Sequence, residues 1–400
     1  MNPTLKKLLP VLGPGWVVML ADLDAPSVIT AIQSGIEFKA HLIIFLIVLI
    51  IPLFYVQDTS SRIGAVTGKT LGQVISQQFG HGWTVTAVAG TAVIDFAAYV
   101  GEFAGIAVAA SIIGIPILIT IIFVIAVHTL VIITGKYKKI EIFLVAMGFL
   151  LFLFVFLDLL VYPHNVHFAD FNPYVPSNSF SFLIAANIGA VIMPWMLFYH
   201  QAADVDAGIK ISGMKKESWG TLQGAIASEG LMIAIVVFSW KLAQDGFIKG
   251  NSVTYVAAAL GHEVGPIGPL IFAIAVGVAG LLAMFVISMS MSYSLSDVFR
   301  MKGSFNKGFS KQKKFYGIYL LEIIPAAILT LLITDLINLA LDIMVLSSIA
   351  LALPLLVVIR IGSNEKIMGR YRIGKLRTIF LYVFMVLAVG LGIFSILQVV

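Results

Sequence analysis

The sequence predicts an all-α polytopic membrane protein, arranged as two five-helix units of opposite orientation plus an eleventh helix. Three observations lead to this fold class. The 400 residues are 60% apolar and only 11% charged, a composition that is not expected of a water-soluble globule. The apolar residues form stretches long enough to cross a bilayer. Two of these stretches are interrupted by a proline at corresponding places in the chain.

The predicted spans follow from length and composition. A transmembrane helix needs roughly 20 mainly apolar residues. The stretches that meet this requirement are residues 10–33, 40–57, 85–113, 116–134, 139–161, 181–204, 220–242, 265–297, 315–334, 337–360 and 377–399. Spans longer than one bilayer thickness are expected to tilt or to extend beyond the lipid. Asp335 lies in a short polar turn and supports a reversal between the ninth and tenth spans.

The basic residues orient these spans. If the N-terminus is cytoplasmic, all 25 Lys and Arg residues except Lys39, Lys241 and Lys249 fall on the cytoplasmic side, as the positive-inside rule requires. We therefore expect a multi-pass protein of the plasma membrane with a cytoplasmic N-terminus and an external C-terminus. The net charge of +5 is assigned to this orientation and not to nucleic-acid binding. No removable signal peptide is expected, because Lys6 and Lys7 precede the first span without a small-residue cleavage pattern.

The first break is the polar run 21–27, Ala-Asp-Leu-Asp-Ala-Pro-Ser, in the middle of the first span. Its carboxylates, Asp22 and Asp24, are costly at bilayer depth, and Pro26 removes one helical amide and frees carbonyl groups. A bound cation would satisfy both needs. A matching break with a proline, 190–195, lies in the sixth span. The chain has no Cys, so a metal held here would need oxygen, imidazole or thioether ligands.

The number of spans predicts an internal repeat. Five spans precede the loop 162–180 and five follow it, so two similar units would insert with opposite orientation. Broken helices at corresponding positions of two such units mark the substrate site in LeuT-type transporters. We therefore expect a LeuT-type inverted repeat with spans 1 and 6 broken. The first unit is 1–161, the external connecting loop is 162–180, the second unit is 181–360, and residues 361–400 form a cytoplasmic loop and the eleventh span.

Several segments resemble the Nramp family of divalent-metal transporters, from about residue 13 to residue 360 and most strongly in the first half. These segments are Gly13-Pro14, the loop Gln57–Leu71 after span 2, Gly101–Gly105 in span 3, Lys138–Glu141 at the start of span 5, and Met193-Pro194 with His200 in span 6. The resemblance implies a LeuT-type fold and transport of a divalent metal ion through a site between the broken spans 1 and 6.

The resemblance also implies a set of ligands. The family's Asp-Pro-Gly-Asn motif of span 1 corresponds to residues 24–27, in which the acid is kept and the amide ligand is replaced by a shorter hydroxyl. The family's Met-Pro-His motif of span 6 corresponds to residues 193–195, in which the thioether is kept and the imidazole is replaced by an indole. The expected metal site consists of Asp24, Ser27, Met193 and the backbone carbonyls of Ala21 and Ala190.

Three departures from the family pattern concern proton movement. Typical members have an Asp three residues before the Glu of span 3, where this chain has Tyr99 before Glu102. They have an Arg shortly after span 6, where this chain has Ala207, and a Gln in span 10, where Ser348 stands here. We therefore expect transport without proton coupling. This pattern resembles the Nramp-related magnesium transporters more than the manganese and iron importers.

The ligand chemistry leaves the ion open. The shorter Ser27 widens the site, so that Asp22 and Asp24 could hold a partly hydrated Mg²⁺ ion, which prefers oxygen ligands. Met193 favours Mn²⁺, Fe²⁺ or Cd²⁺ instead, because a thioether is a poor ligand for magnesium. We expect both Mg²⁺ and Mn²⁺ to be transported, and we expect no resident cofactor.

Further polar residues inside the apolar spans have two interpretations. Intramembrane acids and histidines mark ion or proton routes by default, but each could instead be a paired or capping structural group. The candidates for an ion or proton path are Asp22, Asp95, Tyr99, Glu102, Trp195, His200 and Ser348.

We expect a monomeric secondary transporter for divalent metal ions that works by alternating access. The alternatives left open are a proton-coupled Mn²⁺/Fe²⁺ importer, a divalent-cation channel and a sodium-coupled carrier of an organic solute. An enzyme is not expected, because the spans contain neither a nucleophile with its base nor a His-Glu-x-x-His metal motif. The run 64–70 has one residue too few between its glycines for a phosphate-binding loop.

Overall fold

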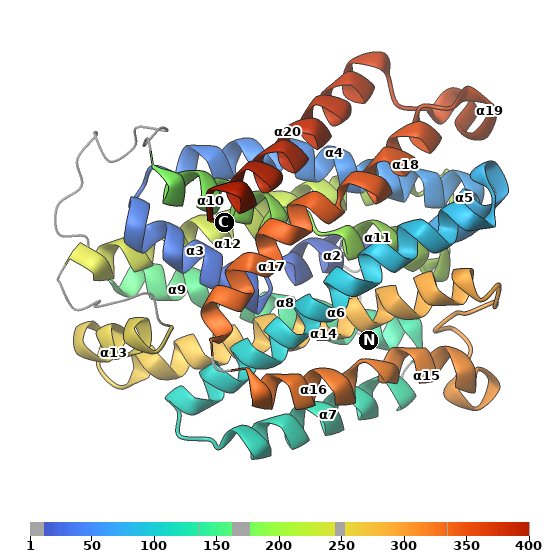
Figure 1. Ribbon diagram of the computed structural model, residues 1–400. Helices are drawn as coiled ribbons and strands as arrows, with labels where there is room; N and C mark the ends of the chain where they lie inside the picture. Colours follow the sequence, from blue (N-terminus) through green and yellow to red (C-terminus); the bar gives the residue numbers. More distant parts are fainter. Residues whose placement is uncertain (1–11, 135, 162–176, 245–252, 334, 400) are drawn as a thin grey trace.

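The structure of the chain, a computed structural model, is a bundle of α-helices (Figure 1). It describes residues 12–399 except 135, 162–176, 245–252 and 334. Within these residues there is no β-strand. The segment before the first span and most of the predicted connecting loop lie outside the described residues.

The helices of the first half are α2 (Pro14–Asp22), α3 (Ala25–Phe38), α4 (Ile43–Thr67), α5 (Leu71–Phe79), α6 (His81–Ile112), α7 (Ile117–Thr134), α8 (Tyr137–Leu150) and α9 (Leu153–Leu160). Those of the second half are α10 (Asn178–Val191), α11 (Pro194–Ala207), α12 (Met214–Gln244), α13 (Val253–Glu263), α14 (Ile267–Val298), η2 (Phe309–Lys311), α15 (Lys313–Leu321), α16 (Ile323–Leu332), α17 (Leu336–Ala350), α18 (Ala352–Gly362), α19 (Glu365–Met368), η3 (Gly369–Tyr371) and α20 (Lys375–Val399).

The helices coincide with the predicted spans. In the described part of the chain, nine helical stretches are long and apolar enough to cross a membrane, four of them made of two successive helices, and the bent pair α2–α3 makes a tenth. The shorter apolar helix Ile117–Ile133 corresponds to the predicted span 116–134. The boundaries differ most at α4, which continues to Thr67, and at α12, which begins at Met214. Both helices extend beyond the predicted lipid boundary on the side predicted to be cytoplasmic.

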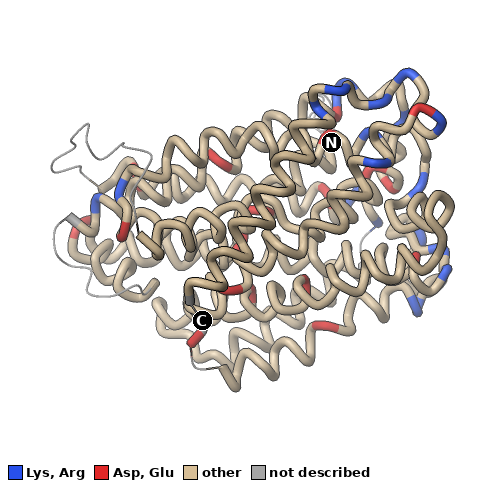
Figure 2. The backbone as a smooth tube through the Cα atoms, turned by 45° about the horizontal axis from the view of Figure 1, so that its top comes forward, with Lys and Arg blue, Asp and Glu red and all other residues tan. Residues whose placement is uncertain are grey.

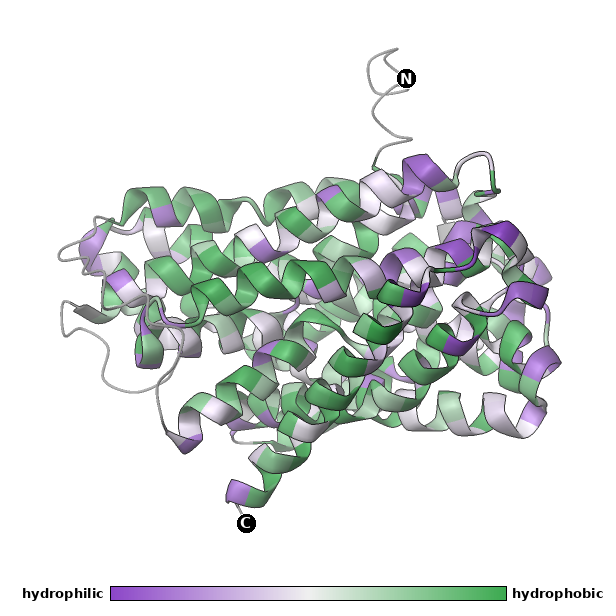
Figure 3. Ribbon diagram, turned by 90° about the horizontal axis from the view of Figure 1, so that it is seen from above, coloured by the Kyte–Doolittle hydropathy of each residue, from purple (hydrophilic) through white to green (hydrophobic). Residues whose placement is uncertain are grey.

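The distribution of charge and hydropathy fits a bundle surrounded by lipid. Figure 2 shows Lys and Arg gathered at one end of the bundle, with Asp and Glu also found in its middle, and Figure 3 shows apolar residues along the central part of the helices. Large apolar side chains are exposed on the outer helices, among them Ile47, Val48, Leu118, Phe123, Val386 and Leu387. The basic end is the one predicted to face the cytoplasm.

The two predicted breaks lie in the centre of the bundle. Helices α2 and α3 meet at an angle of 51° across Leu23 and Asp24, and α10 and α11 are separated by Ile192 and Met193. Helix α3 contacts α6, α10, α12 and α17, while α11 contacts α2, α4 and α14. Pro26 and Pro194 stand in the first turn of α3 and α11, where a proline costs no hydrogen bond. The surrounding helices therefore enclose both breaks.

Two other predicted spans are divided into two helices near a proline, whereas span 139–161 is divided into α8 and α9 without one. Span 315–334 consists of α15 and α16, which meet at Glu322, and span 337–360 consists of α17 and α18, which meet at Leu351. Pro325 and Pro354 stand in the first turns of α16 and α18. A proline cannot donate to the carbonyl four residues earlier, and its ring crowds that carbonyl, which explains the interruption at these positions.

Glycines of α6 allow this helix to approach the first break closely. A Cβ atom built on Gly105 would lie 2.3 Å from the Cβ of Ala25, and one on Gly101 would lie 2.9 Å from the Cγ of Pro26. Such distances are far below van der Waals contact. The absence of side chains at Gly101 and Gly105 thus lets α6 bring Glu102 against the start of α3.

Candidate metal site between the two broken helices

Asp24 lies at the first break as the N-cap of α3. Its backbone is extended (φ −85°, ψ 176°), and its Oδ1 accepts a hydrogen bond of 2.7 Å from the amide of Ser27. This is the usual geometry of an aspartate N-cap. The side chain is fully buried, and Oδ2 has no hydrogen-bond partner among the described residues. One carboxylate oxygen is therefore used for capping, and the other is left for a ligand.

Ser27 connects the two broken helices. Its hydroxyl donates a hydrogen bond of 3.1 Å to the carbonyl oxygen of Ala190, 163 residues away in the last turn of α10. Both residues are buried. The structure thus brings together two of the predicted ligands from opposite halves of the chain, the hydroxyl of Ser27 and the carbonyl of Ala190.

Glu102 of α6 provides a hydrogen-bond acceptor at the first break. Its Oε2 accepts a hydrogen bond of 3.0 Å from the amide of Ala25, which in an unbroken helix would bond to the carbonyl of Ala21. The Ala21 carbonyl is thereby released from its helical partner. Asp24 is the main charged neighbour of Glu102, whose Oε1 has no hydrogen-bond partner among the described residues. Glu102 therefore forms part of the same cluster as Asp24.

Met193 lies at the second break as the N-cap of α11. The indole Nε1 of Trp195 donates to the Met193 sulfur at 3.0 Å, and the amide of Met193 donates to the sulfur of Met196 at 3.3 Å. The carbonyl of Trp195 accepts a bond of 2.9 Å from the hydroxyl of Ser290. Trp195, predicted as a residue of the ion path, is thus a partner of the thioether that was predicted as a ligand.

The donor set at the breaks is mainly oxygen. The Oδ2 of Asp24, the hydroxyl of Ser27 and the carbonyl groups of Ala21 and Ala190 are hard donors of the kind that Mg²⁺, Ca²⁺ and Mn²⁺ accept. A buried carboxylate oxygen without a hydrogen-bond partner is costly. A divalent cation near Asp24 would compensate this cost.

A second pair of buried acids lies next to the first break. Asp22, at the end of α2, is 2% exposed, and its Oδ1 has no hydrogen-bond partner among the described residues. Glu229 of α12 is its main charged neighbour, and both carboxylate oxygens of Glu229 are buried without a partner among those residues. Glu229 was not named from the sequence, although it is an acid inside an apolar span, the same signal that singled out Asp95 and Glu102.

Asp95 and Tyr99 continue along α6 from Glu102. Both are buried, and the Tyr99 hydroxyl lies 3.3 Å from Nε2 of His128 on α7, which is also 3.0 Å from the hydroxyl of Tyr319 on α15. Asp95 has Glu322 as its charged neighbour, and Oδ1 of Asp95 has no hydrogen-bond partner among the described residues. Asp95, Tyr99 and Glu102 thus line one side of α6 in a polar column that begins at the first break.

His200 and Ser348 lie away from the breaks. His200 is seven residues beyond Met193 on α11, and its Nδ1 is 3.2 Å from Oε1 of Gln57 on α4. Ser348 donates to the carbonyl of Val345 at 2.7 Å, and its hydroxyl faces Gly392 of α20. The geometry therefore associates His200 with the middle of α4 and the start of α12, and Ser348 with the contact between α17 and α20.

Comparisons with known proteins place this geometry in a family. A family model described as "Natural resistance-associated macrophage protein-like" (Nramp) matches residues 15–398. The divalent metal cation transporter MntH of Bacillus subtilis (strain 168) is 26% identical over 409 residues, which cover 98% of this chain and 92% of that protein. The MntH of Levilactobacillus brevis is 23% identical over 427 residues, covering 98% and 90%.

The solved structures agree with the predicted fold. The Eremococcus coleocola manganese transporter, in complex with an aromatic bis-isothiourea substituted compound, aligns with a TM-score of 0.79 at 18% identity, covering 99% of this chain and 88% of that chain. A Na⁺-coupled sialic acid symporter in a substrate-bound outward-open state aligns with a TM-score of 0.63 at 16% identity, covering 97% and 90%. The predicted LeuT-type fold is confirmed. Because the family model spans nearly the whole chain, this protein belongs to the Nramp family.

Proposed function

We propose that this Nramp-family chain is a secondary transporter that carries divalent metal ions across the plasma membrane by alternating access. Mg²⁺ and Mn²⁺ are its cargo, and their transport is not coupled to protons. The names of the relatives, which are divalent metal cation and manganese transporters, support the class of substrate. We further propose that residues 1–161 and 181–360 are the two inverted units and that the transporter is a monomer.

The observation that carries this proposal is the buried Oδ2 of Asp24 at the first break, which has no hydrogen-bond partner among the described residues. In the proposed site this oxygen supplies the main charge, and Ser27 with the carbonyls of Ala21 and Ala190 supplies neutral oxygens, directly or through water. The donors come from both broken helices, so a rearrangement of the two halves changes the site. This is what alternating access requires of a substrate site.

The preference for a hard ion is supported by the partner of Met193. The sulfur accepts a hydrogen bond from the Trp195 indole, which engages part of the electron density that a soft metal would use. The remaining donors are oxygen atoms. Mg²⁺ gives up its water reluctantly and prefers such donors, and Mn²⁺ accepts both oxygen and softer ligands. The pair Met193–Trp195 therefore favours Mg²⁺ and Mn²⁺ over Cd²⁺.

A proton-coupled Mn²⁺ importer is the second candidate. It is favoured by the position of Glu102, which accepts a hydrogen bond from Ala25 at the first break and has Asp24 as its main charged neighbour. A metal ion that binds Asp24 would change the charge beside Glu102. Asp95 is the second acid of the polar column along α6. Such a column could release a proton when the metal enters. The test below separates the two candidates.

The test is uptake by purified protein in liposomes, with internal Mg²⁺ and internal pH recorded together while external Mg²⁺, Mn²⁺ and Ca²⁺ are varied. Saturable Mg²⁺ entry that is inhibited by Mn²⁺ and causes no acidification supports the proposal. Mn²⁺ entry with acidification and without Mg²⁺ flux supports the second candidate. Flux that does not saturate would indicate a channel.

The matched variants are Asp24→Asn and Asp158→Asn. The substitution Asp24→Asn keeps a side-chain oxygen to cap Ser27 but removes the charge, so uptake should fall at least about tenfold, which corresponds to about 1.4 kcal/mol. Asp158 of α9 is an acid of a spanning segment that pairs with Lys241 at 2.8 Å, away from both breaks. Its replacement should leave uptake unchanged. Uptake by Asp24→Asn equal to that of the wild type would remove the site from this position.

A further inference from the structure

A second group of potential metal ligands lies where α2, α11 and α12 meet, at the ends of these helices that are predicted to face the cytoplasm. His200 and Asp204 are four residues apart on α11 and so occupy the same face of the helix. Glu217 stands in the first turn of α12. All three side chains are buried, with exposures of 0%, 0% and 3%. Among the described residues, these three side chains place their ligand atoms close enough together to hold one metal ion.

The distances suit a single ion. The Nε2 of His200 lies 3.6 Å from Oε1 of Glu217 and 3.9 Å from Oδ2 of Asp204. The three ligand atoms all lie within 4.8 Å of one another. Metal–nitrogen and metal–oxygen bonds of about 2.0–2.2 Å place neighbouring ligand atoms about 3–4 Å apart. A small adjustment of the carboxylates would therefore allow all three atoms to bind one ion.

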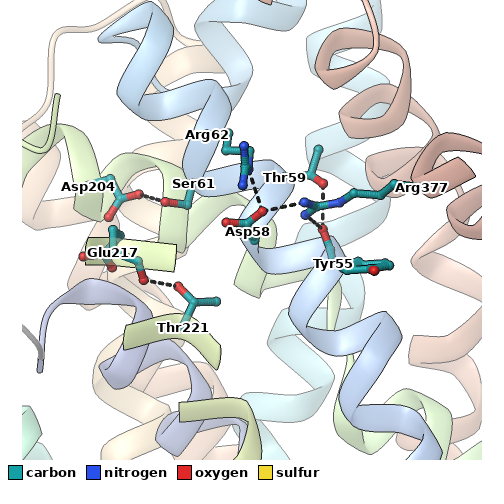
Figure 4. Close-up of polar contacts among 9 residues, drawn as sticks. All are labelled: Tyr55, Asp58, Thr59, Ser61, Arg62, Asp204, Glu217, Thr221 and Arg377. Atoms are coloured by element: carbon teal, nitrogen blue, oxygen red, sulfur yellow. Dashed lines mark hydrogen bonds and ion pairs between the residues drawn. The ribbon is translucent and has the colours of Figure 1, made fainter. Parts of the chain in front are cut away.

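Hydrogen bonds from neighbours hold the three side chains in place, as is usual for metal ligands, and on the two acids these bonds fall on the proposed ligand oxygens. The Nδ1 of His200 is held by Gln57, and Oδ2 of Asp204 accepts 2.5 Å from the hydroxyl of Ser61 (Figure 4). Oε1 of Glu217 accepts 2.6 Å from the amide of Gly15. Figure 4 shows Asp204 and Glu217 side by side, apart from the ion pairs of Asp58.

The ring atom of His200 that faces the two acids has no hydrogen-bond partner in the part of the chain that the structure describes. Nε2 of His200 and Oδ1 of Asp204 are buried without a hydrogen-bond partner among the described residues. In the described part of the chain, the ion pairs of Asp204 and Glu217 involve His200 and no Lys or Arg. Buried carboxylates without a cation are costly. A cation between the three side chains would compensate them.

We propose that His200, Asp204 and Glu217 form a second metal site, which binds a divalent transition-metal ion such as Mn²⁺, Co²⁺ or Zn²⁺. One imidazole and two carboxylates suit these ions, whereas Mg²⁺ prefers oxygen alone. His200 is seven residues beyond Met193, about 10 Å along α11, so this site is separate from the one at the breaks. An ion bound there joins the inner ends of α11 and α12, and Glu217 extends this connection to α2 through Gly15.

The competing explanation is that these residues are purely structural. Glu217 would then only cap the start of α2, and the three side chains would keep their places without a bound ion. Metal binding distinguishes the two explanations. A binding measurement does not depend on transport. It can be made with the site at the breaks intact, or with that site weakened by Asp24→Asn.

The experiment measures Mn²⁺ binding to tag-free protein in detergent by equilibrium dialysis, followed by electron spin echo spectroscopy for ¹⁴N coupling to the bound ion. The ligand set at the breaks contains no nitrogen, so ¹⁴N coupling identifies an imidazole ligand. The variant Asp24→Asn, which weakens the site at the breaks, should still bind Mn²⁺ and show this coupling. The double variant Asp24→Asn/His200→Ala should lose the ¹⁴N coupling.

Two conservative variants keep the test valid if His200→Ala does not fold. Asp204→Asn retains an acceptor for Ser61, and Glu217→Gln retains an acceptor for Gly15. In the Asp24→Asn background each should weaken Mn²⁺ binding at least about tenfold. Asp206→Asn is the matched control, because the Asp206 carboxylate binds Tyr293, Ser304 and Phe305 and not the proposed site.

The proposal is overturned if Asp24→Asn protein binds no Mn²⁺, or if its bound Mn²⁺ lacks ¹⁴N coupling. It is also overturned if Asp204→Asn and Glu217→Gln bind Mn²⁺ as tightly as the control. None of these outcomes bears on uptake through Asp24. Failure of this inference is therefore distinguishable from failure of the proposed function.

Discussion

The hydroxyl of Ser27 donates a hydrogen bond of 3.1 Å to the carbonyl oxygen of Ala190, and this bond joins the first turn of α3 to the last turn of α10. The two residues belong to opposite halves of the chain, and each lies beside a helix break. Ser27 also donates its amide to Asp24. A change in the distance between the two halves would therefore alter three predicted ligands at once.

Ser27→Ala removes the interhelical hydrogen bond and one oxygen donor but keeps the amide that Asp24 caps. We expect the KM for Mg²⁺ uptake to rise about tenfold, because a net hydrogen bond contributes about 0.5–1.5 kcal/mol. The measurement is the concentration dependence of uptake in liposomes. Ser181→Ala in the first turn of α10 is the control, since its hydroxyl donates to the carbonyl of Ser177 in the same helix turn. An unchanged KM for Ser27→Ala would exclude Ser27 from the site.

Trp195→Phe keeps an aromatic ring but removes the N–H that bonds to the Met193 sulfur. The freed thioether should bind soft ions better. We expect Cd²⁺ to compete several-fold more strongly with Mg²⁺ uptake in this variant. Trp83→Phe, at an exposed position of α6, should leave the competition unchanged. Equal Cd²⁺ inhibition of Trp195→Phe and the wild type would contradict a role of this bond in ion preference.

The breaks were predictable because their signals are local. An acid and a proline inside an apolar stretch suffice to indicate an interruption, and Asp24, Ser27 and Ala190 follow from their places beside Pro26 and Pro194. The kinks at Glu322 and Leu351 had a local signal too, in Pro325 and Pro354, but a span counted by hydropathy alone passes through them. In both cases the information lies within a few residues.

The second group of acids depends on contacts between distant segments. Glu217 follows two lysines and lies before the predicted span 220–242, so the search for acids inside apolar spans passes over it. It is buried because α12 begins earlier and because its carboxylate receives the amide of Gly15, 202 residues away. Asp204 stood at a predicted span boundary and is buried by Ser61 of α4. Neither contact leaves a pattern in the sequence near the residue itself.

Glu102 can be tested for a structural and a charge role with two variants. Glu102→Ala leaves the buried amide of Ala25 without its acceptor and should lower the stability by about 1–3 kcal/mol. Glu102→Gln keeps an acceptor and should retain the thermal stability. Thermal unfolding in detergent measures this difference. Equal melting temperatures for both variants would show that the bond to Ala25 is not important for stability.

A comparison of Glu102→Gln with the wild type also addresses proton coupling. If transport is uncoupled, Glu102→Gln should take up Mg²⁺ without acidification, as the wild type does. If protons move through Glu102, wild-type uptake should be accompanied by acidification that the Gln variant lacks. Simultaneous recording of internal pH and Mg²⁺ separates these results.

Arg377 anchors the eleventh span to the bundle. Its guanidinium donates 2.6 Å to Oδ2 of Asp58 and 2.5 Å to the carbonyl of Tyr55, both on α4 (Figure 4). A lysine cannot reproduce this two-point contact. Arg377→Lys should therefore lower the stability by about 1–3 kcal/mol, the range for hydrogen bonds to charged groups. Arg370→Lys is the control, because exposed polar contacts contribute about 0–1 kcal/mol. Equal melting temperatures for Arg377→Lys and Arg370→Lys would contradict the anchoring role of Arg377.

Gly105 provides a test of how closely α6 must approach the first break. Gly105→Ala would place a Cβ 2.3 Å from the Cβ of Ala25, so α3 or α6 must move. Overpacking of this kind costs about 1–3 kcal/mol, and the displacement should also separate Glu102 from Ala25. We expect lower thermal stability together with reduced Mg²⁺ uptake.

Gly90→Ala on the same helix is the matched control for Gly105→Ala. A Cβ at Gly90 meets nothing within 4 Å, and alanine is favoured over glycine in a helix by about 1 kcal/mol. This variant should be at least as stable as the wild type and should transport normally. If Gly105→Ala behaved like Gly90→Ala, the close approach of α6 would not be required, and the position of Glu102 beside Asp24 would not depend on the glycines of α6.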